Sequence, residues 1–167
     1  MRHTHGFTLI EVLITITIMV VLLVLAVVSM SSSEVRARDE ERATDMSVLA
    51  QQLENYYISG GDTSTVIGRY PGTTDIDTEA ELTAVLRNID PKVLRTPGIT
   101  TASPMSLIMA TTNSATQAPT ASQYIYQPLT STGALCTVMA TGECRKYNIY
   151  YRVENTSTTQ VIASKNQ

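Results

Sequence analysis

The sequence predicts an α+β protein in which one long N-terminal α-helix packs on a small antiparallel β-sheet head. Three observations carry this prediction. No glycine or proline occurs between Phe7 and Ser59, so nothing in that stretch has to break a helix. From Ala43 onward apolar residues recur at helical spacing. Between Cys144 and Glu154 apolar and polar residues alternate, which is typical of a half-buried strand.

The first part of the predicted helix is apolar enough to cross a membrane. Residues 7–30 carry one charge, Glu11, and as a helix these 24 residues span about 36 Å, against roughly 30 Å of hydrocarbon. A cleaved secretory signal has a shorter apolar part. Neither that reading nor a plain transmembrane anchor explains Glu11, because a carboxylate in a membrane-length segment is costly and needs a partner.

The residues Gly6-Phe7-Thr8-Leu9-Ile10-Glu11 resemble the prepilin signature of type IV pilins and pseudopilins. The resemblance implies that a membrane-embedded prepilin peptidase cuts between Gly6 and Phe7 and methylates the new amino terminus of Phe7. It also implies a role for Glu11, which would pair with the Phe7 α-amine of a neighbouring subunit during assembly. That amine is cationic near neutral pH, and burial of either charge without the other would be strongly unfavourable.

The resemblance implies an organisation in four segments. These are a leader (residues 1–6), a transmembrane and filament-core helix half (7–30), an amphipathic helix half (31–59) and a globular α+β head (60–167). The protein would be a single-pass inner (cytoplasmic) membrane protein with an extracytoplasmic head before assembly, and part of a cell-surface or periplasmic filament afterwards. Its expected partners are other pilin-like subunits in a homo- or hetero-filament, the prepilin peptidase, pilus or secretion platform proteins, and membrane lipid.

The second half of the helix has one apolar face, formed by Met46, Leu49, Ala50, Leu53, Tyr56 and Tyr57. This spacing predicts packing against the head from about Ala43 onward. Ser59-Gly60-Gly61 supplies a helix stop. The charges that precede the stripe are of mixed sign and are interpreted as a solvated face, with salt bridges between subunits as the alternative: Glu34, Arg36, Arg38, Asp39, Glu40, Glu41 and Arg42.

The remaining residues predict one short helix and several strands. Thr78 and Glu81 have capping-box spacing at the start of a helix over residues 78–88. A polar, exposed loop is expected over residues 113–123. The predicted strands are residues 124–126, ended by Pro128, then 135–139, 144–154 and 160–163. In the third of these, Tyr147, Ile149, Tyr151 and Val153 are expected on one face and Lys146, Asn148, Tyr150, Arg152 and Glu154 on the other.

Cys136 and Cys144 flank a predicted turn at Thr141-Gly142. If the chain is exported, we expect the two cysteines to form a disulfide that closes a hairpin, worth about 2–3 kcal/mol in the chain-entropy model. In the cytosol a free pair would be favoured.

Composition argues against several function classes. A net charge of −3 provides no basic surface for nucleic acid. The only histidines, His3 and His5, lie in the leader, and no catalytic constellation or cofactor motif is present, so neither enzymatic activity nor a cofactor is expected. Asp62, Asp75 and Asp77 lack calcium-loop spacing and are interpreted as loop acids.

Two function hypotheses follow. The first is a structural subunit of a type IV pilus or pseudopilus filament, with major pilin, minor pilin, secretion pseudopilin and competence pseudopilin all open. The alternative is a membrane-anchored extracellular binding or adhesion domain that does not polymerise.

Overall fold

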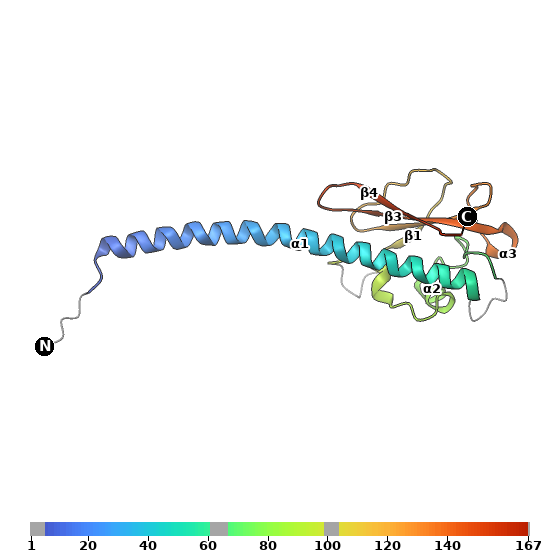
Figure 1. The fold of residues 1–167 in the computed structure, drawn as a ribbon, viewed down its shortest axis with the longest axis horizontal. Helices are drawn as coiled ribbons and strands as arrows, with labels where there is room; N and C mark the ends of the chain where they lie inside the picture. Colours follow the sequence, from blue (N-terminus) through green and yellow to red (C-terminus); the bar gives the residue numbers. More distant parts are fainter. Residues whose placement is uncertain (1–5, 61–66, 99–103, 167) are drawn as a thin grey trace. The chain divides into compact units, whose positions relative to one another are not determined.

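The computed structural model describes residues 6–60, 67–98 and 104–166. In chain order its elements are α1 (Leu9–Ser59), α2 (Glu79–Val85), the 3-10 helix η1 (Pro91–Leu94), β1 (Leu107–Met109), β2 (Tyr124–Thr130), α3 (Met139–Gly142), β3 (Cys144–Arg152) and β4 (Thr159–Ala163) (Figure 1). The chain divides into two compact units, Met1–Ala37 and Arg38–Gln167. Helix α1 contributes residues to both.

Helix α1 has the length and the end that the sequence predicts. It runs for 51 residues and stops at Ser59. Gly60 follows in the left-handed conformation, with φ of 69°, and its N–H donates to the carbonyl oxygen of Tyr56 over 2.8 Å. A residue with a Cβ would be strained at this φ, so the glycine explains why the helix ends here.

The four strands form one sheet in the order β1-β2-β3-β4. The pairs β2–β3 and β3–β4 are antiparallel, whereas β1 is parallel to β2. The α+β class is therefore confirmed, but the sheet is mixed rather than antiparallel throughout. Strand β1 was not predicted, because three residues are too few to show an alternating pattern. Its parallel pairing requires the long connection of residues 110–123.

Two predicted strand boundaries are wrong. Strand β2 continues through Pro128, because β1 pairs with β2 only as far as Tyr126, so no ladder needs an N–H at position 128. The predicted strand at residues 135–139 is reduced to one bridge between Leu135 and Leu129, and Met139 begins helix α3.

The core of the second unit lies between α1 and one face of the sheet. In Figure 1 the C-terminal part of α1 runs between the sheet and the α2 segment. The predicted stripe on α1 is confirmed: Met46, Leu49, Leu53 and Tyr56 are buried, and Ala50 and Tyr57 pack against them. From the sheet the same core receives Leu107, Tyr124, Tyr126, Tyr147 and Ile149.

The opposite face of the sheet is also partly covered. Tyr150 was predicted to lie on the solvent side of β3 but is only 1% exposed. It packs with Ala110 and Ile125, and its hydroxyl lies 3.2 Å from the carbonyl oxygen of Ala115 and 3.0 Å from Oε1 of Gln127. The polar connection between β1 and β2 therefore shields this face, which an alternation rule for one-sided sheets does not anticipate.

A buried carboxylate on α1 holds the C-terminal residues of the unit. Glu54 is 8% exposed and accepts hydrogen bonds from the hydroxyls of Tyr70 and Tyr147, both over 3.0 Å. It also accepts from the backbone N–H of Lys165 over 2.9 Å and from Nδ2 of Asn166 over 2.7 Å. Four neutral donors thus satisfy the buried charge, and no ion pair to Glu54 occurs in the part of the chain that the structure describes.

Candidate processing and assembly site

The start of α1 is a capping box formed by Thr8 and Glu11. The backbone N–H and the hydroxyl of Thr8 donate to Oε2 of Glu11, over 2.8 and 2.7 Å. In return the N–H of Glu11 lies 3.4 Å from Oγ1 of Thr8. Thr-x-x-Glu is the reciprocal arrangement that satisfies the free N–H groups at a helix start. Glu11 therefore has a partner inside its own chain, and its charge also lies at the favourable end of the helix dipole.

The sequence contains a signal for this capping box that the interpretation of Glu11 missed. Thr78 and Glu81 have the same spacing, were predicted to cap α2, and do so in the structure. The same rule applied to Thr8 and Glu11 identifies the capping pair.

The helical residues after Glu11 expose an apolar surface. The large hydrophobic side chains of residues 12–27 are 49–67% exposed, and Phe7 is 88% exposed. By length and composition alone, α1 is the one helix among the described residues that could cross a membrane. An apolar surface of this extent in one monomer requires lipid or other protein to cover it.

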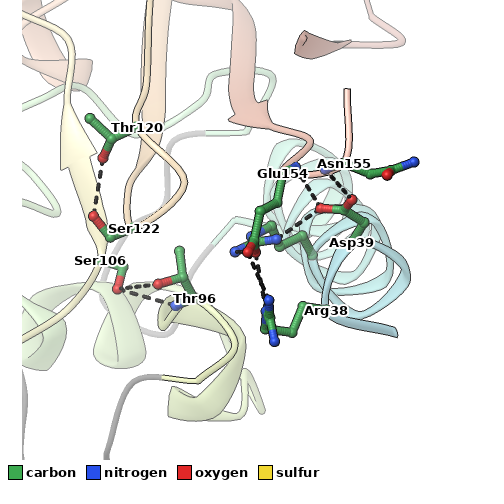
Figure 2. A network of polar contacts seen from close by, with 9 residues as sticks. Arg38, Asp39, Thr96, Ser106, Thr120, Ser122, Glu154 and Asn155 are labelled. Carbon is green, nitrogen blue, oxygen red and sulfur yellow. Dashed lines mark hydrogen bonds and ion pairs between the residues drawn. The ribbon is translucent and has the colours of Figure 1, made fainter. Parts of the chain in front are cut away.

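At the beginning of the second unit, charged residues of α1 bind the turn between β3 and β4. The guanidinium of Arg38 donates to both carboxylate oxygens of Glu154, over 2.7 and 3.1 Å, and Arg42 donates to Oε2 of Glu154 over 3.0 Å. Asp39 accepts from the backbone N–H groups of Glu154 and Asn155, over 2.7 and 3.0 Å. Figure 2 shows Arg38 and Asp39 facing Glu154 and Asn155 across this contact.

This network corrects the interpretation of the charged stretch as a solvated face at Arg38, Asp39 and Arg42. The other acidic and basic side chains of the stretch include three that are exposed, as predicted: Glu34, Arg36 and Glu40. Arg42 is only 3% exposed, since it lies between Asp39 and Glu154. The hydrogen bond from Arg38, with that from Arg42, lowers the pKa of Glu154 to about 2. Packing against the sheet thus begins one turn before Ala43, through ion pairs rather than apolar contacts.

The disulfide joins Cys136 to Cys144, with 5.5 Å between their Cα atoms. Its loop contains α3, so it does not close the simple hairpin that was predicted. The segment after Arg69 docks on the same loop: the N–H of Tyr70 donates to the carbonyl oxygen of Cys144, and that of Thr73 to the carbonyl oxygen of Cys136. This segment is therefore built into the core, with Tyr70 fully buried.

The loop acids have structural contacts. Asp75 Oδ2 accepts from the backbone N–H groups of Gly72 and Met139, each over 2.7 Å. Asp62 lies outside the described residues. Among the described residues no group of three or more His, Cys, Asp or Glu side chains has the arrangement of a metal site.

Taken together, these features define a class: a single long helix with an exposed apolar N-terminal part, and a small disulfide-bonded α+β unit. Residues 1–30 match the family model of the prokaryotic N-terminal methylation motif, which is the type IV prepilin-type signature. The motif indicates a type IV pilin-like precursor and points to a structural protein. No curated protein and no solved structure matches the chain.

Proposed function

We propose that this chain is a structural subunit of a type IV pilus or pseudopilus filament. A prepilin peptidase cleaves it after Gly6, methylates the amino group of Phe7, and the N-terminal helix then inserts among those of other subunits. The observation that carries this proposal is that the methylation motif covers residues 1–30, whose helical part exposes its apolar side chains. In the filament core, as in the bilayer, those side chains are removed from water.

The geometry of Glu11 supports the pairing step. Both hydrogen bonds from Thr8 end on Oε2, and within the described residues Oε1 accepts none. The capping box therefore satisfies half of the carboxylate in the free subunit. The amine of a neighbouring Phe7 can add a charge-assisted bond at Oε1 while the capping box stays intact.

The disulfide supports an extracytoplasmic head. Disulfides persist in oxidising compartments and are rare in the cytosol. Both sulfur atoms belong to residues that are at most 1% exposed, so the bond is part of the core of the unit. In this proposal, the head forms the disulfide after export, while the apolar helix holds the subunit in the inner membrane.

The proposal is tested with filaments from cells that express wild type, Glu11→Ala or Thr8→Val. Glu11→Ala removes the carboxylate, so we expect normal cleavage but at least about tenfold fewer filaments, since loss of one member of a buried charge pair is costly. Thr8→Val removes only the hydroxyl of the capping box and keeps the carboxylate, and it should retain filaments.

Electron microscopy with an antibody against the head counts the filaments, and mass spectrometry checks cleavage in each strain. Equal filament yields from Glu11→Ala and wild type would contradict the pairing role. Wild-type protein that stays in the membrane without filaments, in cells that have the assembly machinery, would instead favour the non-polymerising binding domain.

A further inference from the structure

Among residues 6–60, 67–98 and 104–166, no segment pairs with either edge of the four-stranded sheet. β1 and β4 are the outer strands, and each pairs with one neighbour only. An open edge presents unpaired N–H and C=O groups to any chain that can align with it. Natural edge strands are usually protected by charges, prolines or bulges. Neither Leu107–Met109 nor Thr159–Ala163 contains a charge, a proline or a glycine.

The register identifies which backbone groups point outward. Between β3 and β4, the N–H of Ser164 donates to the carbonyl oxygen of Tyr147, and the N–H of Val153 donates to the carbonyl oxygen of Thr158. The backbone N–H and C=O groups of even-numbered residues along β4 therefore point toward β3. The backbone groups of Thr159, Val161 and Ala163 therefore point to the open edge.

Between β1 and β2, the N–H of Tyr124 donates to the carbonyl oxygen of Ser106, and the N–H of Ala110 donates to the carbonyl oxygen of Tyr126. The backbone groups of Ile108 therefore point toward β2. The backbone groups of Leu107 and Met109 consequently point to the opposite open edge.

An apolar row crosses the sheet and ends exposed at both edges. Ile108 is opposite Ile125, Ile125 is opposite Tyr150, and Tyr150 is opposite Val161. Opposite residues share a face, so the four side chains lie in one line. Ile125 and Tyr150 in the middle are buried, whereas Ile108 is 40% and Val161 52% exposed. Each edge strand thus has an exposed β-branched side chain at its centre.

We propose that the β4 edge of one copy pairs with the β1 edge of a second copy of this chain, in parallel, with Val161 opposite Ile108. In this register the N–H of Val161 donates to Leu107 of the second copy, and its carbonyl oxygen accepts from the N–H of Met109. In the same register, the carbonyl oxygen of Thr159 accepts from the N–H of Leu107, and the N–H of Ala163 donates to the carbonyl oxygen of Met109. The apolar row then continues from one head into the next.

Strand direction favours a second copy as the occupant. β1, β2 and β4 all run the same way, because β2 and β4 are both antiparallel to β3. Pairing β4 with β1 therefore keeps the two copies pointing in the same direction and can repeat indefinitely. Pairing β4 with β4 would need a twofold axis and would stop at a dimer. The contact goes beyond the proposed function, because it joins heads and does not involve the processed N-terminus.

The test is site-directed cross-linking of the full-length protein, in membranes and in filaments, with a short bifunctional thiol reagent. The native cysteines are the only two in the chain and are joined to each other, so introduced cysteines are the only free thiols. The variant I108C/V161C should give a ladder of dimers, trimers and larger species. A mixture of the single variants I108C and V161C should stop at dimers.

The matched control is I108C/T156C, whose second cysteine is exposed in the β3–β4 turn but lies off the edge; it should stay monomeric. V161K places a charge at the centre of β4 in the native chain and is not expected to alter the tyrosine circular dichroism of the fold. A163K in the I108C/V161C variant places a lysine two residues after position 161, on the same face of β4. This charge should weaken the ladder.

The outcomes separate this contact from the proposed function. Filaments that form normally while I108C/V161C stays monomeric would overturn the head contact and leave the filament proposal standing. Dimers from V161C alone would show β4–β4 pairing and overturn it as well. A V161C adduct with a different protein, without a ladder, would contradict the second copy as occupant. A ladder in membranes of cells that form no filaments would support the contact and count against the filament.

Discussion

Arg42 and Glu154 form a 3.0 Å ion pair although 112 residues separate them in the sequence. The pair joins the part of α1 with which the second unit begins to the loop between β3 and β4. Arg38 and Asp39 complete the contact, so the carboxylate of Glu154 and the backbone behind it are both held by one helical turn. The position where the head begins to pack on the helix is therefore set by electrostatics.

This relationship predicts how the stability of the head depends on acid. Because the folded-state pKa of Glu154 is lowered to about 2, its stabilising contribution is fully present above about pH 4.5 and is lost as the pH falls toward 2. Glu154→Gln should lose about 1–2 kcal/mol at pH 7, after allowance for the partial exposure of the pair. Its difference from wild type should shrink steadily below pH 4.5.

Thermal unfolding followed by tyrosine near-ultraviolet circular dichroism measures this effect, since all eight tyrosines lie between Tyr56 and Tyr151. Glu143→Gln is the control, because the side chain of Glu143 is 58% exposed and its closest ion pair, to Arg69, is 3.4 Å long. A Glu154→Gln variant with the pH profile of wild type would show that the network contributes no stability.

Asp45 predicts the opposite dependence on pH. Burial, and then the nearby charge of Glu41, raise its pKa to about 6. The folded state binds this proton more tightly than the unfolded state, so wild-type stability should fall as the pH rises from about 4 to 6. Asp45→Asn should remove that dependence and gain about 0.5–1 kcal/mol at pH 7 in the same unfolding measurement.

Glu40→Gln provides the comparison for Asp45, since Glu40 is exposed on the same helix. It should change stability by less than about 0.5 kcal/mol. If Asp45→Asn is less stable than wild type at pH 7, the carboxylate makes a favourable contact that outweighs its burial, and the account of Asp45 is wrong.

Gly72 predicts a steric effect on the disulfide loop. A Cβ at this position would lie 2.3 Å from the carbonyl oxygen of Thr137, so Gly72→Ala must displace backbone. We expect a loss of about 2–3 kcal/mol or more. Gly133→Ala is the matched comparison: its φ is 85° but a Cβ there meets no atom within 4 Å, so only the backbone cost of about 1–2 kcal/mol applies. Equal losses for the two variants would contradict close packing at Gly72.

The parts of the fold that follow from local pattern were predictable. The stripe from Met46 to Tyr56 has helical period, Gly60 is a helix stop, and Thr78 with Glu81 caps α2; all three appear in the structure. Each depends on residues within one or two turns of one another. The α+β class follows from these elements and from the alternation in β3.

The parts that depend on long-range partners were not predictable from pattern. Arg42 resembles any surface arginine until Glu154 is placed beside it. A proline, which lacks a backbone N–H, ends a strand only where a neighbouring strand needs that donor, and β1 stops short of position 128. Tyr150 is buried by a loop that the sequence marks merely as polar. Thr8 with Glu11 is the exception, because its capping spacing is local and was available in the sequence.

The measurement that most directly tests the central claim is the mass of the mature N-terminal peptide from the native membrane or filament fraction. If the methylation motif at residues 1–30 directs processing, the peptide begins at Phe7 and carries one additional methyl group on its amine. A strain without the prepilin peptidase should yield the peptide that begins at Met1. An intact Met1 in the presence of the peptidase, or a start near residue 30, would contradict the account.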